Sequence, residues 1–435
     1  MMQQNLINQA AQLSKPDNDI SSWTVLHPIE LLSGYMPVFV AALLTTLILT
    51  PIVRRVAISA NIIDHPDQAR KQHAYPIAYL GGIAIFAGVL AGIGAGIIFP
   101  SGQASLLQGV PVSVVVGMLA IVFTGLADDI WKWDPRLKIA GQLVAAAALA
   151  IEDVGPQLAA GVLSAICGEP KDILFSIGAF HVQNSELYYW LGTAITAIFV
   201  IGGCNAANLI DGLDGLLAGT TTIMALGFLA ISLTMAYALP VENTETSLAG
   251  TRIILSLILL GVTLGFLPYN FNPAVIFLGD CGSLLIGYLS VVIIMTFGEF
   301  GTTKYSVAGL ICFGLPILDT TLAIIRRKVA GLSMSDADSN HIHHRLKRYF
   351  GGNVRKTVLT LYAIAFGFSV LGAGLTAMLL LTSVKGIVVE GAALAAYVLL
   401  VAFALKRGFQ QEWLKKERAK NPSRAMDLDQ EQTKA

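Results

Sequence analysis

Long apolar runs separated by short polar segments dominate the pattern of residues along this chain. A helix needs about 20 mainly apolar residues to cross the hydrocarbon core of a membrane, where only closed backbone hydrogen bonding is tolerated. Eleven segments meet this requirement: 34–53, 81–99, 110–126, 138–153, 187–203, 216–239, 252–269, 284–298, 305–325, 357–382 and 386–405. The pattern predicts an all-α polytopic membrane protein with about 11 transmembrane helices.

The composition agrees with this class. Hydrophobic residues make up 55% and charged residues 13% of the 435 residues, whereas soluble domains carry about 25% charged residues. The mean hydropathy is +0.68. We expect a polar N-terminal extension (1–33), a transmembrane domain (34–405) and a basic tail (406–435), and the extension lacks the features of a signal peptide.

The formal net charge is zero, so no field of one sign favours a nucleic-acid partner. The four cysteines have neither CxxC nor CxH spacing. Their arrangement therefore indicates neither a structural zinc site nor a disulfide framework.

Basic residues show which side of the membrane each loop occupies, because Lys and Arg gather on the cytoplasmic side. With the N-terminus outside, 23 of the 28 Lys and Arg residues fall in inside segments. We therefore predict a periplasmic N-terminus and a cytoplasmic C-terminus. Five inside loops lie between spans: 54–80, 127–138, 204–215, 270–283 and 326–356.

The polar residues within the membrane domain cluster in these five loops. The first contains Arg70, Lys71 and His73, which could supply positive charge to a phosphate, although an ordinary connection explains most of it.

The second loop contains Asp128 and Asp129 at the inner end of the third span. Acids at a helix C-terminus oppose the helix dipole, and acids at a membrane boundary are usually functional. A metal or a transferred proton would offset their repulsion.

The third loop repeats a polar residue every three positions, at Asn205, Asn208, Asp211 and Asp214. On a helix each would neighbour the next. An Asx cap with glycine turns at the start of the sixth span is the alternative, since Asp is favourable at an N-cap. That alternative accounts for one Asp and leaves the other three polar residues unexplained.

The fourth loop ends in the sequence Gly-Asp-Cys-Gly-Ser, residues 279–283. It offers a flexible backbone, the Asp280 carboxylate and free N–H groups, which together suit a metal-bound phosphate. A glycine-rich turn with an Asp cap is the alternative.

The fifth loop is basic. If it is helical, His341, His344, Arg345 and Arg348 share one face. An amphipathic helix on anionic lipid is the alternative, and a zinc site would need a different histidine spacing.

Five acids therefore converge with a His/Arg segment on one membrane face: Asp128, Asp129, Asp211, Asp214 and Asp280. Mg²⁺ is commonly bound by one or two carboxylates together with substrate phosphates, and metal neutralises charge during phosphoryl transfer. The residues alone predict a Mg²⁺-dependent enzyme that acts on a diphosphate at a membrane surface.

With these motifs in view, the sequence resembles the bacterial polyprenyl-phosphate N-acetylhexosamine-1-phosphate transferases. The resemblance rests on Ala-Asp-Asp (127–129), NAANLIDGLDG (205–215), NPAVIFLGDCGS (272–283) and HIHHRL (341–346), which occur in the family's order. It implies transfer of a sugar 1-phosphate from a UDP-sugar to undecaprenyl phosphate, with release of UMP.

The fifth loop looks like the branch that uses UDP-N-acetylglucosamine to start O-antigen, enterobacterial common antigen or teichoic acid. The branch that uses UDP-N-acetylmuramoyl-pentapeptide usually has three contiguous histidines and a Thr-Pro-Thr-Met-Gly-Gly stretch. Here that stretch reads Tyr-Pro-Ile-Ala-Tyr-Leu-Gly-Gly (75–82), which argues against the pentapeptide donor.

Carried over position by position, the resemblance implies three sets of residues. The catalytic set is Asp128 (the candidate base for the lipid phosphate), Asp129, Asp211 and Asp214. The set that contacts the donor is Asn208, Asp214, Phe277 (stacked on uracil), His341, His343, His344 and Arg345. The metal set is Asp280 and Asp129, holding Mg²⁺ with Mn²⁺ as a substitute.

The implied location is the bacterial inner membrane, with a homodimer as a further expectation. Two alternatives stay open at this point. One is the same reaction with another UDP-N-acetylated amino sugar. The other is a secondary transporter, although transporters place charges near the midplane and often in repeated halves, whereas these acids lie at span ends on one side.

Overall fold

The computed structural model of the protein describes residues 26–64, 76–152, 173–177, 180–239, 247–299, 303–330, 341–382 and 391–402, and the single residues 241, 244, 388 and 406. Residues 1–25 of the predicted extension lie outside this part of the chain. So do Arg70, Lys71 and His73 of the first loop and the predicted tail beyond residue 406.

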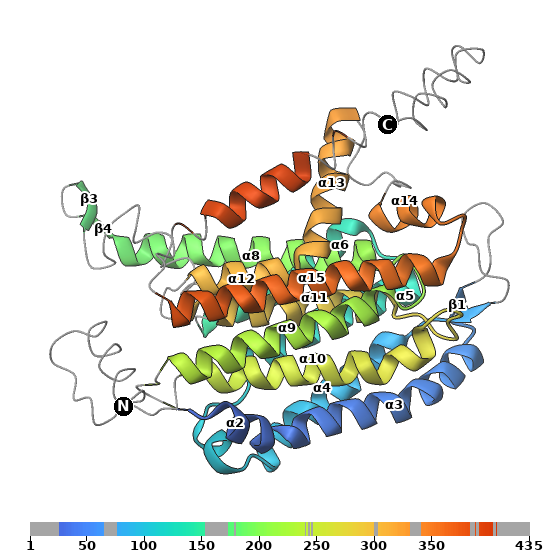
Figure 1. Ribbon diagram of the computed structural model, residues 1–435, viewed down its shortest axis with the longest axis horizontal. Helices are drawn as coiled ribbons and strands as arrows, with labels where there is room; N and C mark the ends of the chain where they lie inside the picture. Colours follow the sequence, from blue (N-terminus) through green and yellow to red (C-terminus); the bar gives the residue numbers. More distant parts are fainter. Residues whose placement is uncertain are drawn as a thin grey trace.

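The described residues form a bundle of long helices that run side by side (Figure 1). The helices are α2 (Pro28–Gly34), α3 (Met36–Ser59), α4 (Gly81–Ile98), the 3₁₀ helix η2 (Gly102–Leu106), α5 (Val112–Trp131), α6 (Pro135–Ile151), α8 (Asn184–Ile210), α9 (Leu216–Ala238), α10 (Ala249–Asn270), α11 (Gly279–Thr296), α12 (Thr303–Cys312), α13 (Gly314–Ala330), α14 (Ile342–Tyr349) and α15 (Val354–Leu381). Two small antiparallel pairs join β1 (Ile63–Asp64) to β2 (Ile77–Ala78) and β3 (Ile173–Ile177) to β4 (Phe180–Gln183).

The predicted all-α polytopic membrane class is confirmed. Within the described residues, eight helices are long and apolar enough to span a membrane, or nine if one bent pair is a single span. The predicted fourth span forms the 17-residue helix α6, and the last is described as the shorter apolar helix Gly391–Ala402. The count of eleven stays a prediction.

The predicted span 305–325 is broken into α12 and α13, which meet at 79°. The sequence supplies the reason, because Pro316 lacks the N–H that would bond to the carbonyl of Cys312 in a continuous helix. The second half, α13, crosses the direction of the long helices (Figure 1). A hydropathy window cannot detect such a break, because both halves are apolar.

Helix α11 occupies the centre of the bundle and is buried along nearly all of its length, whereas α3 and α15 are largely exposed. Glycines let neighbouring backbones approach it. A Cβ at Gly82 of α4 would lie 2.3 Å from the Gly282 nitrogen, and one at Gly287 would lie 2.5 Å from the Gly203 oxygen of α8. Close approach at small residues is the usual basis of helix packing in membranes.

An ion pair fastens the far end of α11. The Arg252 side chain at the start of α10 lies 2.9 Å from Glu299, and the two side chains are only 3% and 4% exposed. Glu299 also accepts a hydrogen bond of 2.8 Å from the Leu248 amide. Because both charges are buried, removal of either partner would leave an uncompensated charge.

We predict that Gly287→Ala destabilises the protein far more than Gly94→Ala. The new methyl group at 287 would meet the backbone of α8, whereas the one at 94 would meet nothing within 4 Å. Overpacking of this kind costs about 1–3 kcal/mol, and Ala is otherwise favoured in a helix. Thermal unfolding of both variants in detergent checks this, and equal transition temperatures would contradict it.

Candidate functional site

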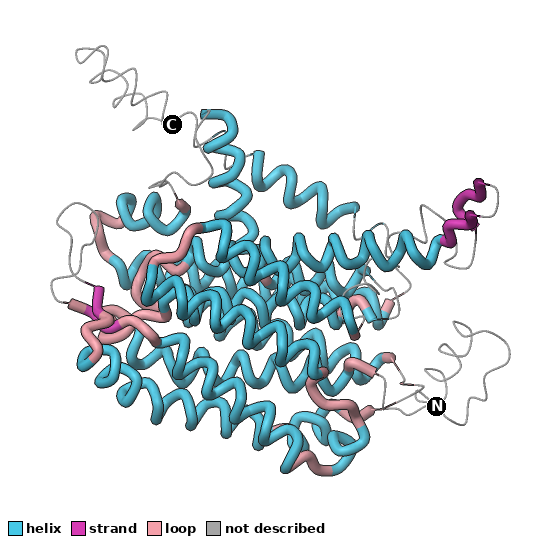
Figure 2. The backbone as a smooth tube through the Cα atoms, turned by 180° about the vertical axis from the view of Figure 1, so that it is seen from behind, coloured by secondary structure: helices cyan, strands magenta, loops and turns pink. Residues whose placement is uncertain are grey.

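The residues predicted to carry the chemistry lie at one end of the bundle, where α5 and α8 end and α11 begins. Figure 2 shows loops and the β1–β2 pair gathered at this end, which we call the acidic end. Two helices extend beyond the predicted ends of their spans at this end of the bundle. Helix α5 continues to Trp131, so it contains Asp128 and Asp129, and α8 continues to Ile210, so it contains Asn205 and Asn208.

Asp129 caps the N-terminus of α11 from the end of α5. Its Oδ1 accepts a hydrogen bond of 2.7 Å from the Asp280 amide, and its Oδ2 accepts one of 3.0 Å from the Cys281 amide. Asp129 is unfavourable for the dipole of α5, at whose C-terminal end it lies, but favourable for the dipole of α11, whose N-terminus it caps. The expectation that these two N–H groups are free for a phosphate is wrong, because Asp129 occupies both.

Glycine makes this contact possible. Gly279 has φ +70°, and a Cβ there would lie 2.5 Å from Asp129 Oδ2. A Cβ at Gly125 of α5 would lie 2.5 Å from the Cys281 Cα. Helices α5 and α11 therefore touch backbone to backbone beside the acids.

Lys138 joins two of the predicted acids. Its Nζ lies 2.8 Å from Asp128 Oδ2 and also pairs with Asp280 Oδ2. Lys138 comes from the first turn of α6 and is absent from the residues predicted from sequence. The available signal was its position at the inner end of a predicted span, in the second inside loop, whereas Asp280 lies in the fourth.

Asn208 holds the other oxygen of Asp280. Its amide donates to Asp280 Oδ1 and to Ser283 Oγ, both at 2.9 Å. One turn deeper, the Asn205 amide donates to Gln142 Oε1 at 2.9 Å. The three-residue spacing therefore placed both asparagines correctly on one helix face.

Asp211 lies just beyond the end of α8, close to the other acids. Burial, and then the charges of Asp280, Asp129 and Asp214, raise the pKa of Asp211 to about 8. In this arrangement the Asp211 carboxyl group therefore holds a proton at neutral pH, which makes it a hydrogen-bond donor.

Asp214 fastens the fourth loop. Its Oδ2 accepts hydrogen bonds from the Asn272 side chain at 2.8 Å and from the Ala274 amide at 3.0 Å. Asn270 supports the same loop, accepting from the Gly215 amide at 3.1 Å and donating to the Ile276 carbonyl at 3.0 Å. The catalytic and donor-binding roles of Asp214 stay predictions, and the structure gives it a positioning contact.

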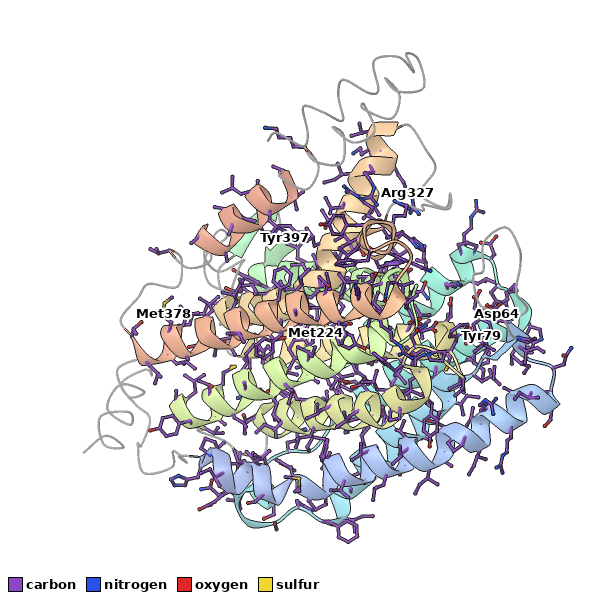
Figure 3. The ribbon with its side chains drawn as sticks, turned by 45° about the vertical axis from the view of Figure 1, so that its right-hand side comes forward. Asp64, Tyr79, Met224, Arg327, Met378 and Tyr397 are labelled. Carbon is purple, nitrogen blue, oxygen red and sulfur yellow. The ribbon has the colours of Figure 1, made fainter. Side chains whose placement is uncertain are left out.

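Phe277 stands on an extended segment beside β2. Its amide donates to the Ala78 carbonyl at 2.9 Å, and its carbonyl accepts from the Gly81 amide at 3.0 Å. The half-buried ring meets the edge of the Tyr79 ring, with centroids 6.0 Å apart. Burial, followed by Asp64 and then acids of the site, raises the pKa of Tyr79. Figure 3 shows Tyr79 beside Asp64 at this end.

The fifth loop forms the predicted helix, α14, but its histidines are not all cations. His343 is buried, and a Cβ at Gly212 would lie 2.3 Å from its Nε2. Burial, and next the neighbouring His344, lower the pKa of His343 to about 3, and burial also lowers the pKa of His344. The basic face predicted for this loop, His341, His344, Arg345 and Arg348, does not include His343. The role of His343 at the donor stays a prediction.

A second unpredicted residue, Asp319 of α13, contacts the start of α14. Its Oδ2 lies 2.8 Å from His341 Nδ1, and its Oδ1 accepts a hydrogen bond of 2.7 Å from the Ile342 amide. Asp319 falls within the predicted span 305–325, outside the five loops in which polar residues were sought. Arg345 lies one turn into the same helix.

Comparison with known proteins gives two kinds of match. The family model described as glycosyl transferase family 4 matches residues 111–298, a range that begins before α5 and ends just after α11. It therefore includes every predicted acid of the site, from Asp128 to Asp280.

Relatives match most of the chain. A probable undecaprenyl-phosphate N-acetylglucosaminyl 1-phosphate transferase of Bacillus subtilis is 37% identical over 337 residues, which are 76% of this chain and 82% of the relative. A decaprenyl-phosphate N-acetylglucosaminephosphotransferase of Mycolicibacterium smegmatis is 33% identical over 75% of this chain and 79% of the relative. A phospho-N-acetylmuramoyl-pentapeptide-transferase of Desulforudis audaxviator is 30% identical over 78% of this chain and 97% of the relative.

We predict that the adjacent acids Asp128 and Asp129 differ in their effect on stability. Asp129→Asn removes one acceptor from two buried amides, and an unpaired buried donor costs about 1–3 kcal/mol. Asp128→Asn keeps a side-chain oxygen that can accept from the partly exposed Lys138, so it should cost less stability than Asp129→Asn. Thermal unfolding of the two purified variants checks this. An equal loss of stability would show that Asp129 does not cap α11.

Proposed function

The chain belongs to glycosyl transferase family 4, within it to the polyprenyl-phosphate N-acetylhexosamine-1-phosphate transferases that its motifs resemble, and we propose that it transfers N-acetylglucosamine 1-phosphate from UDP-N-acetylglucosamine to undecaprenyl phosphate. An oxygen of the lipid phosphate would bond to the phosphorus that carries the sugar, and the bond to UMP would break. The observation that carries the proposal is the cluster of Asp128, Lys138 and Asp280 at the end of membrane helices.

The proposed donor follows from the relatives and from two loops. The names of the Bacillus and Mycolicibacterium relatives specify N-acetylglucosamine. The sequences at 75–82 and 341–346 also differ from those typical of the muramoyl-pentapeptide branch. A related UDP-N-acetylated amino sugar is the alternative donor.

Asp128 and Lys138 suit the acceptor phosphate. Both lie where α5 ends and α6 begins, at the depth where the phosphate of a membrane lipid would meet the protein. Asp128 would accept the phosphate proton, and Lys138 would offset the negative charge of the reacting oxygens. Asp211 stands beside these acids and would face a phosphate of the donor.

We propose Mg²⁺, with Mn²⁺ as a substitute, as the cofactor. Within the described residues no group of three or more His, Cys, Asp or Glu side chains is arranged to hold a metal. Mg²⁺ nevertheless needs only one or two carboxylates plus substrate phosphates, and Asp280 and Asp128 already share one cation, the Lys138 ammonium. When bound, the metal would neutralise charge on the diphosphate.

The two oxygens of Asp129 already accept backbone hydrogen bonds, so we assign Asp280 the main ligand role. Asn208 orients the Asp280 carboxylate through its hydrogen bond to Oδ1. Asp129 would act on the metal site by fixing the first turn of α11, on which Asp280 stands.

We place the acidic end in the cytoplasm of a bacterial cell, at the inner membrane. The support is the distribution of basic residues, 23 of 28 of which fall on that side. This side also supplies the UDP-sugar.

The transfer is tested by incubating purified protein with undecaprenyl phosphate and each member of a panel of UDP-sugars, and identifying the lipid product by mass. We expect a diphosphate-linked N-acetylglucosamine lipid and UMP. If the only product comes from another UDP-amino sugar, that sugar is the donor in place of UDP-N-acetylglucosamine. If no donor gives a lipid product, the proposed reaction is wrong.

We predict that Asp280→Asn abolishes most activity by weakening metal binding while the protein still folds. The neutral amide is a poorer ligand for a hard cation. Titration of Mg²⁺ and Mn²⁺ in a detergent assay, with thermal unfolding alongside, checks this.

The matched control is Asp134→Asn, because Asp134 caps α6 and Asn is an equally good cap. It should keep wild-type metal dependence. Normal turnover of Asp280→Asn at the wild-type metal concentration would remove Asp280 from the ligand set.

We predict that Phe277→Ala raises the KM for the UDP-sugar about tenfold and leaves the KM for the lipid phosphate unchanged. Base–aromatic stacking contributes about 1–3 kcal/mol, and a tenfold change corresponds to about 1.4 kcal/mol. A contact that is equal in ground and transition states affects KM and not kcat.

Val275→Ala is the control, since Val275 lies two residues away on the same segment and is 41% exposed. Steady-state kinetics with each substrate varied separately measure both constants. Equal weakening of both substrates would mean that Phe277 holds the loop and does not bind the base.

A further inference from the structure

Asp319 is a buried carboxylate that none of the sequence motifs includes. It lies in α13, just after the break that separates this helix from α12, and only 1% of its side chain is exposed. Both of its oxygens are engaged at the start of α14, one by the His341 ring and the other by the Ile342 amide. The structure thus ties the broken membrane helix directly to the histidine segment.

The contact determines the orientation of the His341 ring. His341 is the N-cap residue of α14 and makes no side-chain cap of its own. With Nδ1 against the Asp319 carboxylate at 2.8 Å, that nitrogen carries a hydrogen, and Nε2 is left to face the other way. A carboxylate behind a histidine commonly fixes the tautomer and the direction of the ring in this manner.

His341 in turn contacts the rest of the site. Its ring stacks on that of His343, with centroids 5.6 Å apart and an interplanar angle of 14°. His343 packs against Gly212, the residue next to Asp211. A chain of contacts therefore runs from Asp319 through two histidines to the third loop, which carries the predicted catalytic acids.

A helix cap alone does not explain a charged residue at this position. Asn, Ser or Thr satisfies a helix N-terminus as well as Asp does, and a buried ionised carboxylate is costly unless a partner compensates for it. The His341 ring is the described group that does so at hydrogen-bond distance.

We propose that Asp319 is a positioning residue for the transfer reaction, which acts by holding the His341 imidazole toward the diphosphate. This role rests on the proposed function. Because the carboxylate orients a ring that acts on developing charge, its loss lowers kcat more than it weakens either substrate.

The experiment compares Asp319→Asn, Asp319→Glu and Thr320→Val in purified protein whose wild-type transfer has first been established. Asp319→Asn should lower kcat by about 10–100-fold, by analogy with metal sites, where loss of the carboxylate that orients a histidine has an effect of this size. Each KM should stay within about threefold of wild type. Asp319→Glu, which keeps the charge, should recover part of kcat, and Thr320→Val should match the wild type.

A double-mutant cycle separates positioning from simple capping. If Asp319 acts through His341, then Asp319→Asn lowers the kcat of a His341→Ala protein by no more than about twofold. If Asp319 only caps α14, Asp319→Asn keeps an acceptor for the Ile342 amide and leaves kcat near that of its parent in both backgrounds. Losses that multiply would mean that Asp319 affects kcat by a route other than His341.

Three outcomes would overturn the proposal: a full wild-type kcat in Asp319→Asn, multiplying losses in the cycle, or a loss of thermal stability that accounts for the whole effect. A wild-type protein that makes no lipid product from any UDP-sugar would overturn the proposed function and this role with it. Active wild-type protein with unaffected variants would overturn this role alone.

Discussion

The hydrogen bonds from the first turn of α11 to Asp129 fix the geometry of the acidic end. They join the C-terminus of α5 to the N-terminus of α11. The Asp129 carboxylate thus lies between the negative end of the α5 dipole and the positive end of the α11 dipole. Because Asp129 satisfies these amides, the Asp280 side chain is left to meet Lys138 and Asn208.

Close packing makes the arrangement rigid. Helix α11 is surrounded by helices that approach it at glycines, including Gly82, Gly125 and Gly203. In a membrane, exclusion of water does not drive helices together, so shape and hydrogen bonds must do so. The same small residues that fix the position of α11 thus fix the position of Asp280, and the ion pair of Arg252 with Glu299 fastens the opposite end.

Acidic residues near lipid need compensation, and here it comes from several helices. Lys138 of α6 offsets two acids, and burial together with the neighbouring acids raises the pKa of Asp211 to about 8. On the other side of the site, the Asp319 carboxylate lies 2.8 Å from the His341 ring.

The membrane class, most of the spans and the polar residues that gather at one end could be predicted from the sequence alone, because span length and helical spacing are local properties. The three-residue spacing placed Asn205 and Asn208 on one face, and the motifs identified the family before any comparison. Only the tertiary structure revealed the partner of Asp129, the bridging Lys138, the burial of His343 and the contact of Asp319 with His341. The composition of an apolar helix does not indicate which other helix it packs against. Contacts between the helices therefore become known only from the packed structure.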